Sequence, residues 1–308
     1  MTIRELNEAV EKGTIGEMIR VEEARQCKTL SRVADEITAR GKIRLVLVAG
    51  GSAAGKTTTA KRLATQLRVN GAEVLHLSTD DYFVGDRRTP RDEEGNLDYE
   101  HVDCVDRVRL AADVNALCAG EIVPVRRFDF VRHEPYVTEA FHSLSSGGIV
   151  IIEGIHALNP ILTEGVGDEA KFRLFVEPKP SLSLADGTTL RPDEARFLRR
   201  MVRDNQFRKM SPAETIRLWP HVRAGEARWI NPFRPQADAT FDSYLAYEMA
   251  VLKPYVGGLL ERTRLEAGST PLVDRYLDIL STLDIASPDL VPGDSIIRET
   301  IGGSQLEY

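Results

Sequence analysis

The sequence has 308 residues and a mass of 34.3 kDa, and 42% of its residues are hydrophobic. A chain of this length can bury one substantial core or two small ones. The net charge of −7 argues against a generic nucleic-acid binder, which usually presents a basic face. The N-terminus lacks a signal-peptide pattern, and no apolar run approaches the ~18 residues of a membrane span. The three cysteines show no metal-site spacing, which is typical of proteins in the reducing cytoplasm. From the charge, the apolar runs and the cysteines together, we expect a cytoplasmic protein that binds neither nucleic acid nor membrane.

The first 41 residues are charged and predict a helical extension ahead of a larger domain, residues 42–308. Apolar residues recur there at helical spacing, at Ile15, Met18 and Ile19 and again at Leu30, Val33 and Ile37.

From residue 42 onward, apolar strand patterns alternate with helical patterns. We predict strands at residues 43–49, 73–77, 148–152 and 172–176, and helices at residues 56–70 and 105–118. This order indicates an α/β fold with a parallel sheet flanked by helices, in which ligands bind beyond the carboxyl ends of the strands. Residues 179–192 are expected to form a mobile loop, and residues 211–236 a largely irregular insertion.

Residues 50–57 match the G-x-x-x-x-G-K-[ST] pattern of a phosphate-binding loop, between a predicted strand and a predicted helix. In such a loop, backbone N–H groups surround the phosphates, the lysine reaches the β- and γ-phosphates and the threonine hydroxyl can ligate Mg²⁺. The alternative is a glycine-rich turn that matches by chance. The residues expected to contact ATP are Gly51, Ser52, Ala53, Ala54, Gly55, Lys56, Thr57 and Thr58.

Two acidic positions follow predicted strands. Asp80 and Asp81 come after the second strand, where a carboxylate can accept a proton from a substrate hydroxyl or help to hold magnesium. Glu153 ends the strand at residues 148–152, the position of an acid that orients Mg²⁺ or its water. The alternatives are a solvated Asp-Asp turn and an ordinary polar strand end.

A helix predicted from residue 192 onward carries a stripe of arginines that repel one another unless anions meet them. Nucleotide phosphates would supply those anions, and closure of this element would exclude water from phosphoryl transfer. The alternative is neutralisation by protein carboxylates, including Asp204. The stripe consists of Arg196, Arg199, Arg200 and Arg203.

At these residues the chain resembles the uridine kinase and phosphoribulokinase family, from about residue 44 to the C-terminus. Residues 50–58 are similar to its G-G-S-x-S-G-K-T-T loop, with Ala54 in place of the second serine, and residues 196–204 to its arginine-rich lid. The resemblance implies a P-loop kinase with a lid at about residues 179–236, which transfers the γ-phosphoryl group of ATP with Mg²⁺. It assigns Arg196 and Arg199 to ATP, and catalysis to Asp80, Lys56, Arg200 and Arg203.

The resemblance also suggests how the acceptor binds. Residues 78–80 resemble an S-Q-D segment whose aspartate is the base toward a nucleoside 5′-hydroxyl, so Asp80 rather than Asp81 takes that role. Residues 100–103 resemble D-H-P-D, whose last aspartate binds ribose, and residues 128–133 resemble Y-D-F-V-S-H, whose tyrosine and histidine touch the base. The implied acceptor residues are Asp80, Tyr82, Asp103, Phe128, His133 and Arg208, and the implied magnesium ligands are Thr57, Glu153 and Asp80.

The C-terminal region, including residues 295–304, more closely resembles a bacterial branch usually labelled uridine-kinase-like nucleoside kinases. We therefore expect a small-molecule acceptor, a pyrimidine nucleoside, and leave open whether the protein forms a homo-oligomer. Two alternatives remain at this point: a kinase of another polyol or sugar phosphate, and an NTP-dependent regulatory protein whose partner surface is residues 1–40.

Overall fold

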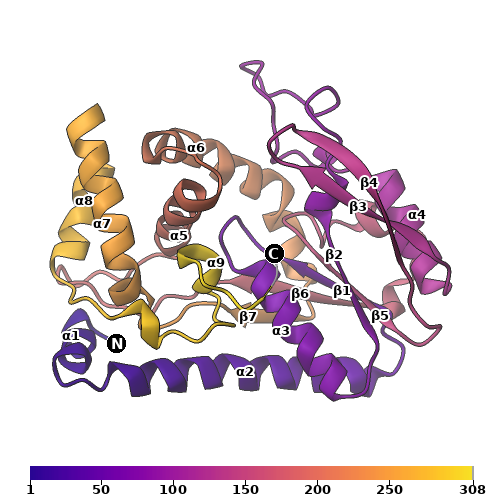
Figure 1. The fold of residues 1–308 in the computed structure, drawn as a ribbon, viewed down its shortest axis with the longest axis horizontal. Helices are drawn as coiled ribbons and strands as arrows, with labels where there is room; N and C mark the ends of the chain where they lie inside the picture. Colours follow the sequence, from indigo (N-terminus) through magenta and orange to yellow (C-terminus); the bar gives the residue numbers. More distant parts are fainter. Residues whose placement is uncertain (307–308) are drawn as a thin grey trace.

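The centre of the protein is a five-stranded parallel sheet with strand order β2-β5-β1-β6-β7, as the computed structural model of residues 1–306 shows (Figure 1). All four neighbouring pairs run parallel. The four strands predicted from the sequence are present, and a fifth adds to the edge of β6. The strands are β1 (Leu45–Ala49), β2 (Val74–Ser78), β5 (Ile149–Glu153), β6 (Lys171–Glu177) and β7 (Ala239–Asp242).

Helices cover both faces of this sheet, which confirms the predicted α/β fold. Val46 and Val48 of β1 pack into one apolar cluster with α2 (Ile15–Arg40) and α3 (Lys56–Val69). Leu45 and Leu47 point to the opposite face, into a cluster that includes α4 (Arg107–Cys118). The strand is buried on both faces, which explains why its sequence is apolar at every position rather than at every second one.

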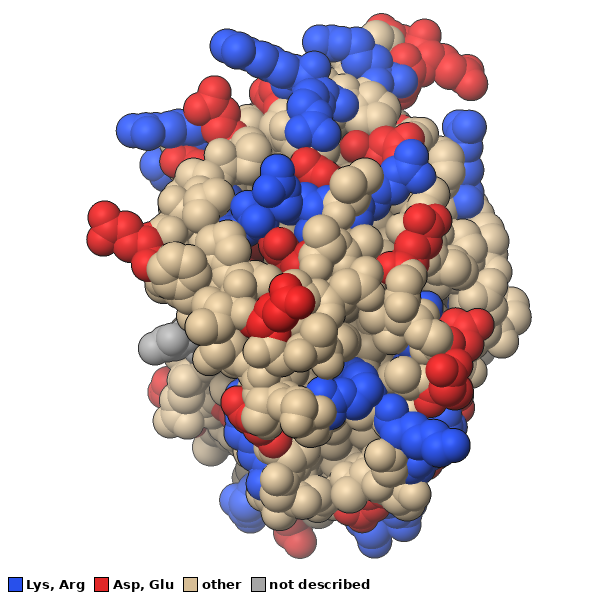
Figure 2. Space-filling view, turned by 90° about the vertical axis from the view of Figure 1, so that its right-hand side faces the viewer, with Lys and Arg blue, Asp and Glu red and all other residues tan. Residues whose placement is uncertain are grey.

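An antiparallel hairpin, which the sequence analysis did not predict, stands beside the sheet (Figure 1). It consists of β3 (Val123–Asp129) and β4 (Glu134–His142). On the side of the molecule that carries the hairpin and α4, Figure 2 shows basic and acidic side chains interspersed. This face therefore lacks the continuous basic surface typical of proteins that bind nucleic acids.

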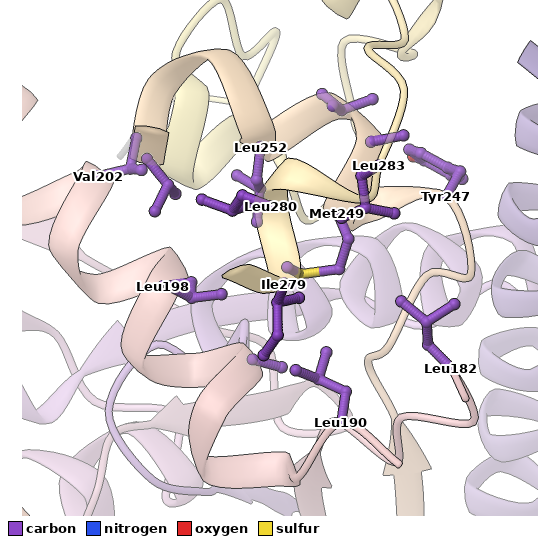
Figure 3. Packing of buried hydrophobic residues seen from close by; sticks show 14 of the residues in the cluster. Leu182, Leu190, Leu198, Val202, Tyr247, Met249, Leu252, Ile279, Leu280 and Leu283 are labelled. Atoms are coloured by element: carbon purple, nitrogen blue, oxygen red, sulfur yellow. The ribbon is translucent and has the colours of Figure 1, made fainter. Parts of the chain in front are cut away.

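A second body of helices packs at the other end of the sheet, around its own apolar cluster. Figure 3 shows Leu198 of α5 facing Ile279 of α8, with Met249 of α7 close by. The N-terminal helix also contributes side chains to this cluster, including Leu6. The helices of this body are α1 (Ile3–Glu11), α5 (Pro192–Phe207), α6 (Pro212–Trp229), α7 (Glu248–Ala267), α8 (Pro271–Ser281) and α9 (Arg298–Ile301).

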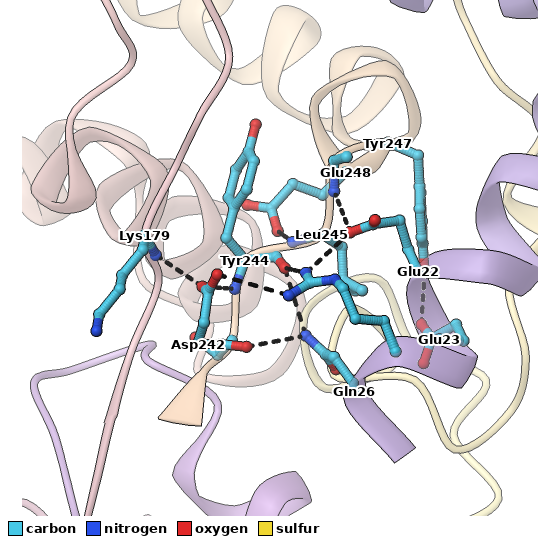
Figure 4. A network of polar contacts seen from close by, with 12 residues as sticks. Glu22, Glu23, Gln26, Lys179, Asp242, Tyr244, Leu245, Tyr247 and Glu248 are labelled. Atoms are coloured by element: carbon cyan, nitrogen blue, oxygen red, sulfur yellow. Dashed lines mark hydrogen bonds and ion pairs between the residues drawn. The ribbon is translucent and has the colours of Figure 1, made fainter. Parts of the chain in front are cut away.

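Most of the first 40 residues lie in the two helices α1 and α2, as the helical spacing predicted, and α2 lies along both apolar bodies. Its first turns join the helical cluster through Ile19, and its later turns pack on the sheet through Leu30. Polar contacts reinforce this position: the Tyr247 hydroxyl donates to Glu23 Oε1 at 2.7 Å, and Gln26 Nε2 donates to two backbone carbonyls (Figure 4). The helix therefore connects the sheet with the helical body.

The prediction of an irregular insertion at residues 211–236 was wrong, because most of this segment is the helix α6 and its end is a 3-10 helix, Asn231–Gln236. Ser211 and Glu214 form a capping box at the start of α6, which stabilises the helix end, and Pro220 does not interrupt it. Residues 179–191 form no helix or strand, as expected, but Ser183 is tied to the N-terminus by its hydrogen bonds with Met1 and Ile3. Within residues 1–306, no helix is both long and apolar enough to cross a membrane.

Candidate nucleotide and acceptor site

The phosphate-binding loop lies where the sequence places it, between the end of β1 and the start of α3. Two of its glycines are required by the backbone. A Cβ at Gly50 would lie 2.1 Å from the carbonyl oxygen of Val176 in β6, and Gly55 has a φ of +87°. The loop therefore packs against the neighbouring strand and leads directly into the N-terminus of α3, the kind of place at which proteins bind phosphate.

Four polar side chains meet at the carboxyl edge of the sheet around this loop. Lys56 Nζ donates to the carbonyl oxygen of Gly51 at 3.1 Å, and Thr57 Oγ1 donates to Glu153 Oε1 at 3.2 Å. Glu153 is the last residue of β5 and is only 5% exposed. Asp80 lies in the 3-10 turn Thr79–Tyr82, directly after the neighbouring strand β2. Parallel strands thus bring residues from three separate segments to one place.

Burial is the main influence on the charged groups of this cluster. Burial and, to a smaller extent, the Asp80 carboxylate raise the pKa of Glu153 to about 7, while Lys56 opposes the shift. Burial lowers the pKa of Lys56, and the two carboxylates oppose that change. Residues 1–306 contain no group of three acidic, histidine or cysteine side chains that could hold a metal alone. Thr57, Glu153 and Asp80 nevertheless fit Mg²⁺, which usually binds one or two carboxylates together with substrate phosphates.

The two adjacent aspartates face different partners. Asp81 Oδ2 accepts a hydrogen bond from Arg127 Nη1 at 2.9 Å, and burial raises the pKa of Asp81 to about 6 against the opposing effect of Arg127. The backbone N–H of Asp80 donates to Ser78 Oγ, and the Asp80 charge acts on Lys56 and Glu153. This arrangement supports Asp80, rather than Asp81, as the carboxylate of the site.

The arginine stripe on α5 is neutralised by protein carboxylates, as the alternative interpretation anticipated. Arg199 is 1% exposed and pairs with Glu248 at 2.5 Å, while its Nη2 also donates to the carbonyl oxygen of Ser243. Arg200 and Arg203 pair with the buried Asp204 at 3.1 and 2.7 Å. Each of these arginines therefore has an anion in this conformation, before any nucleotide is considered.

Two arginines of the stripe also contact the phosphate loop directly. Arg196 Nη1 donates to the carbonyl oxygen of Ser52 at 3.1 Å, and Arg200 Nη1 donates to Ser52 Oγ at 2.7 Å. Arg196 forms its ion pair with Glu226 of α6. The helix α5 thus lies close enough to place two guanidinium groups at the loop.

The C-terminal segment covers the other side of the loop. A Cβ at Gly55 would lie 2.6 Å from Cγ2 of Ile296, and Thr58 Oγ1 donates to Glu299 Oε2 at 3.0 Å. The cavity between this segment, the loop and Arg203 has a volume of about 10 Å³. A ligand pocket usually measures about 300 to 1,000 Å³, so this cavity is too small to hold a nucleotide in this conformation.

Two predicted acceptor residues have partners outside this cluster. Tyr82 is buried, and its hydroxyl donates to Asp113 Oδ2 at 3.1 Å. The Asp103 side chain is 48% exposed and lies 3.5 Å from Arg107 on the surface. Tyr82 therefore lies in the core, and Asp103 lies near the start of α4.

The other acceptor candidates gather at the turn end of the hairpin. Phe128 packs edge-on against Phe83 and Phe130, with ring centroids 5.4 and 5.1 Å apart. His133 lies in the hairpin turn with a φ of +56°, and its Nδ1 is 2.8 Å from the Tyr99 hydroxyl. The Arg208 guanidinium lies 6.0 Å from the centre of the Phe130 ring. These residues form an aromatic cluster that joins the end of α5 to the hairpin.

Sequence reasoning missed two acidic residues at the site. The Oε2 atom of Glu100 is buried without a hydrogen-bond partner, and burial raises the pKa of Glu100 to about 7 while Arg200 and Lys56 lower it. Its signal was present, since Glu100 begins the segment that resembles D-H-P-D. Glu226 accepts a hydrogen bond from the backbone N–H of Ser52 at 3.0 Å, and no local pattern marked it.

Comparison with known proteins agrees with this geometry. Residues 45–249, more than half of the chain, match the model of the phosphoribulokinase / uridine kinase family. A uridine kinase of Deinococcus deserti is 28% identical over 192 residues, which cover 62% of this chain and 83% of that protein. A uridine kinase of Chloroflexus aggregans is 27% identical over 201 residues, covering 64% and 85%.

Two solved structures are similar at lower identity. One is a putative fructose transport system kinase from Silicibacter sp. TM1040, with 20% identity, a TM-score of 0.49 and coverage of 68% of this chain and 98% of that one. The other is a possible uridine kinase from Bacillus stearothermophilus, with 19% identity, a TM-score of 0.46 and coverage of 71% and 100%. On the extent of the family match, and with its phosphate loop at the carboxyl edge of a parallel sheet, the chain belongs to the phosphoribulokinase and uridine kinase family of P-loop kinases.

Proposed function

We propose that this protein transfers the γ-phosphoryl group of ATP to the 5′-hydroxyl of a pyrimidine nucleoside, with Mg²⁺. The observation that carries the proposal is the meeting of Lys56, Thr57 and Glu153 with Asp80 at the phosphate loop. Lysine and threonine at this place would bind the nucleotide phosphates and Mg²⁺. A second carboxylate beside them, Asp80, could accept the proton of an attacking hydroxyl.

In the proposed reaction, the acceptor oxygen bonds to the γ-phosphorus as the bond to the β,γ-bridging oxygen breaks, and ADP leaves. Asp80 takes the proton of the attacking hydroxyl. Lys56 and Arg200 offset the negative charge on the transferred group, since both lie at the loop. Mg²⁺, when bound by Thr57, Glu153 and Asp80, would neutralise phosphate charge, and positioning would account for most of the rate enhancement.

The acceptor would bind between the loop and the hairpin. The buried Oε2 of Glu100 has no partner, so a sugar hydroxyl donating to it would satisfy that atom. Asp103 stays a candidate for the same role from the sequence, although its side chain pairs with Arg107. Phe128 and His133 would line the base pocket, with a phenyl ring where the similar sequences carry tyrosine.

A sugar phosphate is the second candidate acceptor, and Arg208 is the observation that favours it. The Arg208 side chain is 46% exposed, lies 3.7 Å from Asp204 and lies over Phe130, beside the residues proposed to hold the acceptor. An accessible guanidinium at that place could meet a phosphate on the acceptor. A neutral nucleoside would make no use of such a charge.

A panel of acceptors distinguishes the two candidates. Purified protein is incubated with ATP-Mg²⁺ and single nucleosides, sugars or sugar phosphates, and acceptor-dependent ADP release is measured. Uridine or cytidine should give the highest kcat/KM, and the Asp80→Asn variant should lose that activity while Asp81→Asn, its matched control, keeps most of it. Release with a sugar phosphate alone would establish the second candidate, and release with none of the acceptors would refute both.

A further inference from the structure

A carboxylate of the protein itself is bound to the backbone of the phosphate loop. Glu226 of α6 is 3% exposed, and its Oε1 accepts a hydrogen bond from the backbone N–H of Ser52 at 3.0 Å. The same carboxylate forms a two-pronged ion pair with Arg196, in which Nη2 donates to Oε2 at 2.8 Å. Arg196 in turn donates to the carbonyl oxygen of Ser52, so the three residues form one closed group.

The loop fits closely around this pair. A Cβ at Gly51 would lie 2.1 Å from Arg196 Nη1 and 2.5 Å from Glu226 Oε1, so the carboxylate and the guanidinium are packed directly on the loop backbone. A loop N–H and an arginine are the two kinds of group that bind a nucleotide phosphate at such a site. Like a phosphate oxygen, the Glu226 carboxylate offers these two groups a negative charge and hydrogen-bond acceptors.

The helix that carries Glu226 also closes the acceptor side. A Cβ at Gly225 would lie 2.3 Å from Cβ of Glu100, so α6 rests directly on that residue. Nearby, His221 Nε2 lies 3.2 Å from Asp98 Oδ1, and the Trp229 ring lies 4.3 Å from the ring of His101. Because one rigid helix makes all these contacts, withdrawing Glu226 from the loop must also loosen the cover over Glu100.

We propose, resting on the kinase function above, that Glu226 is an internal competitor of the nucleotide phosphate and holds α6 closed until a nucleotide displaces it. Arg196 and the Ser52 N–H then exchange a carboxylate for a phosphate oxygen, so neither is left without an anion. Breaking the buried Arg196–Glu226 ion pair alone would leave Arg196 without an anion. Exchange with a phosphate avoids this free-energy cost. The short connection at residues 208–211, where Lys209 has a φ of +55°, is where α6 turns away from α5.

Nucleotide binding itself tests this inference, without any acceptor. Titration calorimetry measures the Kd of the β,γ-imido analogue of ATP, with Mg²⁺, for the wild type, Glu226→Gln and Glu226→Ala. Removing the internal anion should tighten binding by about fivefold or more, because the competition-free state is then fully populated. Glu248→Gln is the matched control, since it also removes a buried carboxylate from a lid arginine but lies away from the loop. That variant should show no tightening.

Hydrogen exchange of α6 provides the second measurement. The analogue should speed amide exchange across Pro212–Trp229 in the wild type, and Glu226→Gln should show the faster exchange without nucleotide. Unchanged or weaker affinity in both Glu226 variants, or no response of α6 to the nucleotide, would overturn the inference. If neither the wild type nor any variant bound the analogue, both this inference and the kinase proposal would be refuted. Tighter binding in the variants with no acceptor phosphorylated would refute only the acceptor assignment.

Discussion

Thr57 and Glu153 are joined by a 3.2 Å hydrogen bond across the carboxyl edge of the sheet, although 96 residues separate them in the chain. The contact exists because β1 and β5 are parallel neighbours in register, with Val48 opposite Glu153. Each strand ends at the same edge, so the loop that follows β1 meets the acid that ends β5. A hydroxyl and a buried carboxylate at this distance are a suitable pair of ligands for a divalent cation beside a phosphate.

Lys56→Ala should abolish phosphoryl transfer while the protein stays folded. The Lys56 ammonium group donates a hydrogen bond to a loop carbonyl and does not pack in the apolar core. Its main contribution is therefore positive charge at the reacting phosphate. Losing it should lower kcat by about 100-fold or more, corresponding to about 3 kcal/mol of transition-state stabilisation. Steady-state kinetics with the best acceptor gives the effect, and a thermal melt serves as the control. Turnover near the wild-type rate would contradict the assignment.

The arginines of α5 should separate into structural and functional ones. Arg199 is fully enclosed by Glu248 and Ser243, so Arg199→Ala should leave a buried unpaired carboxylate and destabilise the protein by about 3 to 5 kcal/mol. Arg200 contacts Ser52 of the loop, so Arg200→Ala should lower kcat more than it weakens nucleotide binding.

Chemical denaturation and nucleotide titration of both variants give these two quantities. If Arg199→Ala kept its stability and lost ATP affinity instead, the sequence-based assignment of Arg199 to the nucleotide would be correct. An Arg200→Ala variant with weaker binding and an unchanged kcat would indicate that Arg200 acts only in the ground state.

Glu100 should make the free energy of unfolding depend on pH. Its pKa is raised from 4.5 to about 7 in the folded protein, so the folded state holds more protons than the unfolded state between these values. Stability linked to this group is therefore present at low pH and is lost as pH rises toward and beyond 7. Glu100→Gln should raise Tm by about 2 to 4 °C at pH 8 and by less at pH 5. Melting curves across this range test the prediction, and an equal shift at both pH values would contradict it.

Local sequence patterns predicted the phosphate loop and its flanking elements better than they predicted α6 and the hairpin, which lie over the rest of the site. The loop and β1 depend on glycines and apolar residues that adjoin in the sequence, so they could be identified directly. The helix α6 was missed because Pro220 and Gly225 suggested interruptions, although its buried residues recur at helical spacing. The hairpin was missed because most of β4 is exposed and lacks a buried face. The contact between Ser52 and Glu226 spans 174 residues and depends on packing that no spacing encodes.

The acceptor assignment is the most exposed prediction, and it sets Glu100 against Asp103. The unpartnered Oε2 of Glu100 lies within the influence of Lys56 and Arg200, whereas Asp103 faces Arg107 at the surface. Glu100→Gln keeps the shape of the side chain but weakens it as an acceptor of sugar hydroxyls, so KM for the nucleoside should rise by about tenfold or more. Asp103→Asn, the matched control, should change KM by less than about twofold.

A substrate lacking the hydroxyls checks the same contact from the other side. 2′,3′-Dideoxynucleosides should be poor acceptors for the wild type, because they lack the hydroxyls that Glu100 would bind. The Glu100→Gln variant should discriminate against them much less, because its contact with the ribose hydroxyls is already weakened. A wild type that accepts them as readily as ribonucleosides would show that no carboxylate reads the sugar diol. If Asp103→Asn alone lost the discrimination, the resemblance to D-H-P-D would have identified the correct residue and the geometry of this conformation the wrong one. The larger KM effect therefore decides which carboxylate binds the sugar.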